Sequence, residues 1–165
     1  KQPTREFAST SLSRLSDSQT NQLCKQVQSL YEFDLEAVLE TYQCTLYQRA
    51  AQVWLIPEQY LNRFSSLPYA FLGFPLGKLI ANKLELSFEM VSRFGDAFNA
   101  NIYVLPDEYY QDWLGGTDLR GLPLEGIEMG TVVAVRDKLG RNLGAGKAFP
   151  KRLRNLLPSR SLLSN

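Results

Sequence analysis

Residues 130–149 read GTVVAVRDKLGRNLGAGKAF, and this stretch decides the fold. Residues 131–135 form a run of β-branched and small apolar side chains, which is typical of a central strand. Residues 137–141 predict a turn, because Gly140 can take a positive φ without strain. Residues 142–148 predict the returning partner strand. The stretch therefore predicts a β-hairpin in the middle of a sheet.

Basic residues gather in the chain from this hairpin onward. Residues 130–165 hold eight basic residues and one acid, for a net charge of +7, whereas the first 129 residues hold ten basic and sixteen acidic residues, for −6. The eight are Arg136, Lys138, Arg141, Lys147, Lys151, Arg152, Arg154 and Arg160. Such a concentrated positive field attracts a polyanion, of which RNA and DNA are the commonest; a basic tail that only keeps the chain soluble is the alternative.

Composition narrows the class of protein. A chain of 165 residues, 44% hydrophobic and 12% aromatic, fits one domain or two small ones with a real core. No apolar run is long enough for a membrane span and no secretory signal is visible, so we expect an intracellular, cytoplasmic protein. The chain has no histidine, which removes the usual general base and zinc ligand. Cys24 and Cys44 are too few and too far apart for a zinc cluster, and we expect neither metal nor cofactor.

The N-terminal half predicts a mixed α/β domain. Ser16 begins an amphipathic helix, because Leu23, Val27 and Leu30 recur at helical spacing. The predicted elements, in order, are a helix at residues 18–30, a short helix at 33–39, a hairpin at 42–49 and 52–56, a helix opened by Pro57, two strands joined by a turn near 81–83, and a helix at 88–98.

The C-terminal part predicts a small, mainly β module. A short strand at residues 102–105 precedes a helix at 107–114, which Gly115 and Gly116 end. Residues 117–124 predict a loop, and leucines between the basic residues after the hairpin would hold the tail on the body. We expect an α+β fold in three parts: a flexible lead at residues 1–16, an α/β domain at 17–99 and a β module at 100–165.

Three segments of this module resemble the PUA domain, a compact RNA-binding β-barrel. They are the strand, helix and glycine loop at residues 102–116, the strand at 130–135, and LGAGK at 143–147, which is similar to the final strand motif of PUA domains. The resemblance implies a PUA-like β-barrel that holds RNA, with the glycine loop as a place where the RNA backbone approaches closely.

The resemblance continues upstream and points to two groups of proteins. Residues 72–87 resemble the segment before the PUA domain in both, and we expect a pre-PUA-like domain there. Residues 49–61 also fit the hairpin and helix of Nip-seven-type ribosome-biogenesis factors. The other group is the C-terminal region of RsmF-type rRNA 5-methylcytosine methyltransferases, whose terminal stretch is similar to GK at 146–147 and KRLRNLLPSR at 151–160. The last match is the most specific one.

The chain lacks two motifs that such methyltransferases need. It has no glycine-rich loop for S-adenosylmethionine behind a strand and no Pro-Cys nucleophile motif. Cys24 and Cys44 are better interpreted as small core residues than as activated thiolates. The resemblance therefore implies the part that holds RNA without the catalytic part.

The candidate RNA-binding residues are cations for phosphate contacts and the glycine loop, because phosphate neutralisation supplies most of the affinity for RNA. They are Arg120, Arg141, Lys147, Lys151, Arg152, Arg154, Gly115, Gly116 and Thr117. For any single cation, a surface charge of no consequence is the alternative. Of the neighbouring aromatic residues Tyr109, Tyr110 and Trp113, we expect Trp113 in the core.

We expect a monomeric, non-catalytic RNA-binding protein that acts on rRNA in ribosome biogenesis or RNA modification. One alternative is the C-terminal RNA-binding part of an RNA cytosine-5 methyltransferase whose catalytic domain is absent from this chain. Another is a protein-interaction module in which the acidic N-terminal half docks a partner and the basic tail is incidental.

Overall fold

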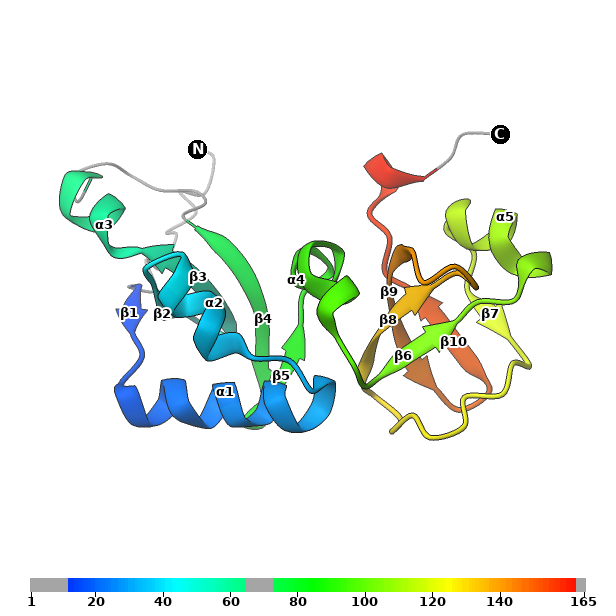
Figure 1. Ribbon diagram of the computed structural model, residues 1–165, viewed down its shortest axis with the longest axis horizontal. Coiled ribbons are helices and arrows are strands. Elements are labelled where there is room, and N and C mark those ends of the chain that lie inside the picture. The colour runs from blue at the N-terminus through cyan, green and yellow to red at the C-terminus, as the bar shows by residue number, and fades with distance from the viewer. Residues whose placement is uncertain (1–11, 65–72, 163–165) are drawn as a thin grey trace, which may run out of the picture.

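The computed structural model describes residues 12–64 and 73–162. Two five-stranded sheets lie side by side along the long axis of the molecule (Figure 1), and the expected α+β fold is confirmed. The elements are β1 (Ser13–Arg14), α1 (Asp17–Tyr31), α2 (Leu35–Thr41), β2 (Cys44–Arg49), β3 (Gln52–Pro57), α3 (Glu58–Phe64), β4 (Phe74–Ile80), β5 (Lys83–Leu86), α4 (Phe88–Phe94), β6 (Ile102–Val104), α5 (Tyr110–Leu114), β7 (Leu119–Arg120), β8 (Val132–Arg136), β9 (Asn142–Phe149) and β10 (Arg152–Asn155).

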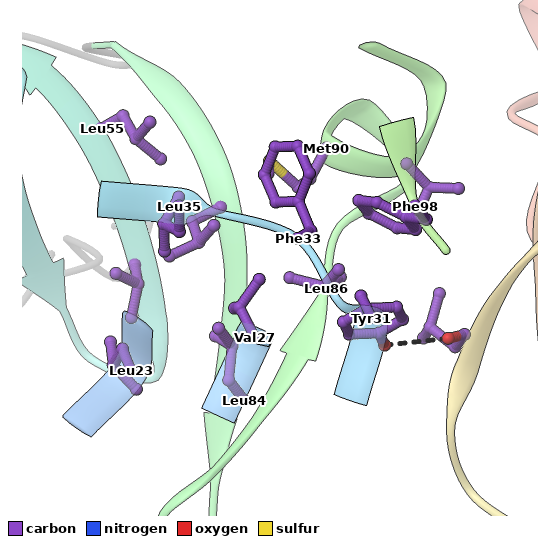
Figure 2. Close-up of a cluster of buried hydrophobic side chains, with 14 of the residues drawn as sticks. Leu23, Val27, Tyr31, Phe33, Leu35, Leu55, Leu84, Leu86, Met90 and Phe98 are labelled. Carbon is purple, nitrogen blue, oxygen red and sulfur yellow. Dashed lines mark hydrogen bonds between the residues drawn. The ribbon is translucent and has the colours of Figure 1, made fainter. Parts of the chain in front are cut away.

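The first sheet is antiparallel throughout and follows the order β1-β2-β3-β4-β5. Alternate residues of its strands, such as Leu46, Leu55 and Leu84, are buried against the helices, as the two-residue period of a strand requires. Leu23 of α1 and Leu35 of α2 belong to the same core cluster (Figure 2). The predicted hairpin at residues 42–56 and the predicted turn near residues 81–83 are confirmed.

Helix α1 begins where the sequence predicts. The Ser16 side chain accepts a hydrogen bond from the Gln19 backbone N–H, while the Gln19 side chain accepts one from the Ser16 backbone N–H. This reciprocal cap satisfies two N–H groups that would otherwise lack partners. Leu23, Val27 and Tyr31 form the buried stripe of the helix.

The second sheet follows the order β6-β8-β9-β10-β7 and curls into a half-barrel (Figure 1). Its central hairpin, β8 and β9, is the one predicted from residues 130–149. The concave side encloses a second core in which Trp113, Val133, Val135 and Leu153 are fully buried. The Trp113 indole N–H donates to the Leu143 carbonyl at 3.0 Å, so the predicted core position of Trp113 is confirmed.

The main core continues from the first sheet into the second. Val132, Ala134 and Ala145 lie on the convex side of the half-barrel and belong to the same buried cluster as Tyr31 and Phe98. The Tyr31 hydroxyl donates to the Val132 carbonyl at 2.8 Å (Figure 2). The β module therefore buries residues of its convex side against its neighbour, and a module of this size gains stability from such docking.

Two short strands differ from the sequence prediction. Ser13–Arg14 pairs with β2 and Leu15 is buried, so the end of the expected flexible lead belongs to the first sheet; residues 1–11 lie outside the described residues. The expected loop at residues 117–124 contains Leu119–Arg120, which pairs with β10. A two-residue strand has no periodicity of its own, and its partner strand decides where it forms.

Two helices are shorter than predicted. The helix expected at residues 88–98 ends at Phe94 and continues as a 3-10 turn at Gly95–Ala97. The helix expected at residues 107–114 begins with a 3-10 turn, Asp107–Tyr109. Such turns are common at helix ends, where the last backbone groups find closer partners.

Candidate nucleic-acid interface

One face of the second sheet carries four of the predicted cations. Arg152 and Arg154 of β10 are two residues apart and so point to the same side of the sheet. Arg154 lies directly opposite Lys147 of β9, and Arg152 lies directly opposite Arg120 of β7. Directly opposite residues in an antiparallel pair share a face. Arg120, Lys147, Arg152 and Arg154 therefore form one surface, the basic face.

The other side of the same strands is apolar. Leu153, which lies between the two arginines of β10, is fully buried, and Leu119 and Ala148 are buried beside it. This alternation fixes which residues face outward, because a slip of one residue would bury the arginines. Half-buried Leu156 and Leu157 hold the following segment on the two cores, as expected for the leucines of the tail.

Phe149 belongs to the basic face, and the sequence analysis did not include it. Phe149 lies directly opposite Arg152, whose guanidinium carbon is 4.9 Å from the ring centroid. The Lys147 Nζ is 5.8 Å from the same centroid. An aromatic ring among cations is an arrangement that can stack a base and neutralise its phosphate. The alternation of positions 147 and 149 in the sequence was the signal that could have revealed it.

Carboxylates of the protein neutralise part of this charge. Lys147 forms an ion pair with Glu85 of β5, in which the two side chains are 19% and 28% exposed. The Arg152 Nη1 lies 3.7 Å from the Asp118 carboxylate. Within residues 12–64 and 73–162, Arg120 and Arg154 form no ion pair. The basic face therefore keeps a net positive charge.

Lys151 lies at the edge of the basic face, in the turn between β9 and β10. Its backbone has a φ of 58°, and its side chain is exposed. The Gly121 N–H donates to the Lys151 carbonyl at 3.0 Å, which places this turn beside the end of β7. Lys151 therefore lies at the end of the sheet where β7 and β10 carry Arg120 and Arg152.

Arg141 is not brought to this face. Arg141 lies just before the first residue of β9, whereas Lys147 lies near the other end of the strand. The two residues are therefore roughly 20 Å apart along the strand. Its Nε donates to the Asp137 carboxylate at 2.5 Å, and that hydrogen bond raises the pKa of the guanidinium. The length of β9 therefore separates Arg141 from the basic face. A contact of Arg141 with RNA stays a prediction.

The glycine loop after α5 lies against the C-terminal segment of the chain. Gly116 has a φ of +86°, and a Cβ atom there would lie 2.8 Å from the Leu162 Cδ2. The Asn155 side-chain amide donates to the Trp113 carbonyl at 2.7 Å, which fastens the segment to the loop. These contacts explain why glycine occupies position 116, while RNA binding at Gly115, Gly116 and Thr117 stays a prediction.

Both cysteines are free and half-buried, and both pack against the main core. Burial raises the pKa of Cys24 to about 11, and the carboxylates of Glu36 and Asp34 add to that increase. Burial likewise raises the pKa of Cys44. At neutral pH both side chains are thiols, whereas a nucleophilic cysteine has a lowered pKa.

Two other kinds of site were sought among residues 12–64 and 73–162. No three histidine, cysteine, aspartate or glutamate side chains there lie close enough together to hold a metal ion. None of the helices in that part of the chain has the length and apolar character needed to cross a bilayer.

No protein-family model matches the chain. A curated protein of Psychromonas ingrahamii, ribosomal RNA small subunit methyltransferase F, is 28% identical over 143 residues, which cover 84% of this chain and 29% of that protein. Proteins of the same name from Pectobacterium carotovorum and Pectobacterium atrosepticum are each 24% identical over 113 residues, which cover 68% of this chain and 22% of those proteins. The chain spans less than a third of the length of these relatives and is distantly homologous to one region of them.

Proposed function

We propose that this chain binds rRNA through the basic face and catalyses no reaction of its own. The single observation that carries the proposal is the register of β7, β9 and β10, which gathers Arg120, Lys147, Arg152 and Arg154 on one side of the sheet. The distant homology to proteins named as rRNA methyltransferases supports RNA of the ribosome as the ligand. The resemblance of residues 102–147 to PUA domains supports the same ligand.

Phosphate groups would supply most of the affinity. Arg120 and Arg154 are exposed and form no ion pair with the residues that the structure describes, and the guanidinium fork matches the geometry of phosphate oxygens. Arg152 lies far enough from Asp118 to exchange its carboxylate for a phosphate. Each phosphate contact releases counterions, so the logarithm of the binding constant falls by about 0.7 per contact and per tenfold rise in salt for single strands.

A second candidate function is the RNA-holding part of a larger RNA cytosine-5 methyltransferase. The observation that favours it is the alignment, which covers 84% of this chain but only 29% of the methyltransferase from Psychromonas ingrahamii. In such an enzyme this chain would position RNA while another part of the polypeptide transferred the methyl group. The length of the encoding reading frame distinguishes the two candidates, and isothermal titration of this chain with S-adenosylmethionine is expected to give no heat.

The test of RNA binding is a charge reversal with a matched control. We expect the pair Lys151→Glu and Arg154→Glu to weaken binding of a labelled single-stranded RNA, followed by fluorescence anisotropy, by about tenfold or more. The control pair is Lys138→Glu with Arg93→Glu, which changes the net charge equally at exposed residues of the turn after β8 and of α4. Affinity for RNA that is equal in both pairs, with both folded by circular dichroism, would refute the proposal.

A further inference from the structure

A large cleft lies where the two halves of the molecule meet. It has a volume of about 1190 Å³ and is lined by α1, by the turn between β4 and β5, and by the segment that leads into β8. Helix α1 points its C-terminal end toward the second sheet (Figure 1). Two of the lining residues join the halves, because the Tyr31 hydroxyl donates to the Val132 carbonyl. Pockets of roughly 300–1,000 Å³ hold whole small ligands, so the cleft has room for a nucleotide.

Hydrogen bonds fix the walls of the cleft. The Gln26 side chain of α1 donates to the Asn82 carbonyl at 3.0 Å and accepts from the Leu84 N–H at 3.1 Å, which holds the turn between β4 and β5 on the helix. The Gly130 N–H donates to the Ala148 carbonyl at 2.7 Å, which holds the segment before β8 on β9. The cleft is therefore formed before a ligand binds, and binding requires little further ordering of the chain.

Helix α1 presents a polar stripe to the cleft. The members of the stripe are exposed and recur at intervals of four, three and four residues, which places them along one side of the helix. They are Ser18, Gln22, Lys25 and Ser29. The amide of Gln22 can both donate and accept a hydrogen bond, so it can match the edge of a nucleobase.

Two exposed apolar side chains also line the cleft. Ile80, at the end of β4, is 53% exposed, and Met129, in the segment before β8, is 44% exposed. The thioether of methionine makes favourable contacts with aromatic rings, and a nucleobase offers such a ring. The cleft thus combines polar groups that match the edge of a base with apolar groups that can cover its face.

The side chains that line the cleft carry a net positive charge. Three lysines stand against two glutamates, namely Lys25, Lys83 and Lys147 against Glu85 and Glu128. Both carboxylates already have partners, because Glu85 is paired with Lys147, and Glu128 lies 3.6 Å from the Lys83 Nζ. The pair of Lys83 with Glu128 is exposed, and exposed pairs contribute little free energy, so Lys83 can exchange this carboxylate for a phosphate.

Lys25 borders both the cleft and a smaller hollow on α1. The smaller hollow is also lined by Asp34 and Glu36. Lys25 forms no ion pair with these two acids or with any other residue that the structure describes. The ammonium of Lys25 is therefore a cation that a phosphate in the cleft can use.

The cleft is continuous with the basic face, since Lys147 belongs to both. Lys147 lies directly opposite Arg154 of β10 on one side and directly opposite Val132 of β8 on the other, and Val132 lines the cleft. Directly opposite residues are neighbours on one face of a sheet. An RNA strand that contacts Arg154 therefore reaches the cleft at Lys147.

We propose that this cleft takes an unpaired nucleotide of the RNA that binds the basic face. This inference rests on the proposed function and adds the form of RNA that is bound. The base would lie against Met129 and Ile80 with its edge toward Gln22, and its phosphates would contact Lys25 and Lys83. An unpaired base has free faces and a free edge, whereas a duplex hides both, so the cleft favours single strands, loops and bulges.

Methionine oxidation measures occupancy of the cleft directly, because the chain has two methionines that differ in access. Met90 is fully buried, whereas Met129 is exposed in the cleft. Mass spectrometry after treatment with hydrogen peroxide gives the oxidation rate of each. Saturation with a single-stranded RNA of about twelve nucleotides is expected to slow oxidation of Met129 by about fivefold or more, while saturation with a duplex of equal length leaves the rate unchanged.

Two variants separate base contacts from phosphate contacts. Gln22→Ala is expected to weaken binding of the single strand by about threefold and to keep its salt dependence. Lys25→Gln is expected to weaken binding by a similar factor and to reduce the slope against the logarithm of salt by about 0.7. The matched controls are Gln28→Ala, on the part of α1 that borders the smaller hollow, and Arg93→Gln on α4, and both are expected to keep the affinity within about twofold.

The outcomes distinguish this inference from the proposed function. A single strand that binds and is released by the Lys151→Glu and Arg154→Glu pair, but neither protects Met129 nor responds to Gln22→Ala and Lys25→Gln, would overturn the cleft alone. Equal protection of Met129 by the duplex would contradict the preference for an unpaired nucleotide. Absence of any binding by the unmodified chain would overturn the proposed function and this inference together.

Discussion

Lys147 of β9 and Glu85 of β5 form an ion pair that joins the second sheet to the first. The two residues are 62 positions apart in the chain. The pair has two consequences, since it links the halves of the molecule and also reduces the positive charge of the basic face.

Glu85→Gln is expected to separate these consequences. Loss of a largely buried partner lowers the free energy of unfolding by about 1 kcal/mol, while release of the Lys147 ammonium raises affinity for RNA by about threefold. Urea unfolding and anisotropy titration measure the two effects. Asp107→Asn is the control, because it releases Lys138 from an exposed pair at 2.7 Å. Affinity that falls in Glu85→Gln would mean that the carboxylate orients Lys147 for its ligand.

Arg136 belongs to the basic C-terminal part of the chain, but its side chain stabilises the fold. Its Nη2 donates to the carbonyls of Gly95 and Phe98 at 2.5 and 2.7 Å, and so ties β8 to the end of α4. Arg136→Met leaves two carbonyls without this donor and is expected to lower the free energy of unfolding by about 2 kcal/mol. Arg154→Met is expected to keep stability and lose affinity for RNA. The reverse pattern in the two variants would contradict both assignments.

Asp137 in the turn between β8 and β9 predicts a pH dependence of stability. Burial alone would raise the pKa of this carboxyl, but hydrogen bonds from the backbone N–H of Arg141, the Arg141 side chain and the Leu139 N–H outweigh burial and hold the pKa below its usual value. The contribution to stability is therefore present above the unfolded pKa of about 4 and is lost as the pH falls through the lower folded value.

Urea unfolding between pH 7 and about pH 3 measures this contribution. Asp137→Asn is expected to be less stable than the unmodified chain at pH 7, with a smaller loss on acidification. Equal slopes of stability against pH in the two proteins would show that the carboxylate does not carry the effect.

Cys24 is expected to react slowly with alkylating reagents. Because burial and neighbouring carboxylates raise its pKa to about 11, the thiolate is scarce at pH 8. Mass spectrometry after iodoacetamide treatment over a series of pH values measures the rate at each cysteine. A rate at Cys24 that levels off below pH 8 would indicate an activated thiol and reopen a nucleophilic role.

The elements with strong local patterns could be predicted from the sequence. The β-branched run of β8 and the apolar stripe of α1 predicted both the type of each element and its position in the chain. They could do so because burial on a sheet or a helix imposes a period on the apolar side chains. The strands β1 and β7 could not be predicted, since Ser13–Arg14 and Leu119–Arg120 take strand geometry only from their partners.

The site was predictable in composition and not in arrangement. The cations of β9 and β10 alternate with apolar residues, so their common face follows from the period of a strand. The partners Glu85 and Asp118 come from distant parts of the chain, and only the tertiary structure brings them close to Lys147 and Arg152. Arg141 is also close to Lys147 in the sequence, yet it precedes the opposite end of β9.

Cross-linking of the unmodified chain to a 4-thiouridine-containing rRNA fragment, with the modified peptides identified by mass spectrometry, tests the central claim most directly. The account predicts that the cross-links fall on Arg120 and on residues 147–154, where the basic face lies. Cross-links confined to α1 and α2, or to the turn at residues 137–141, would contradict it.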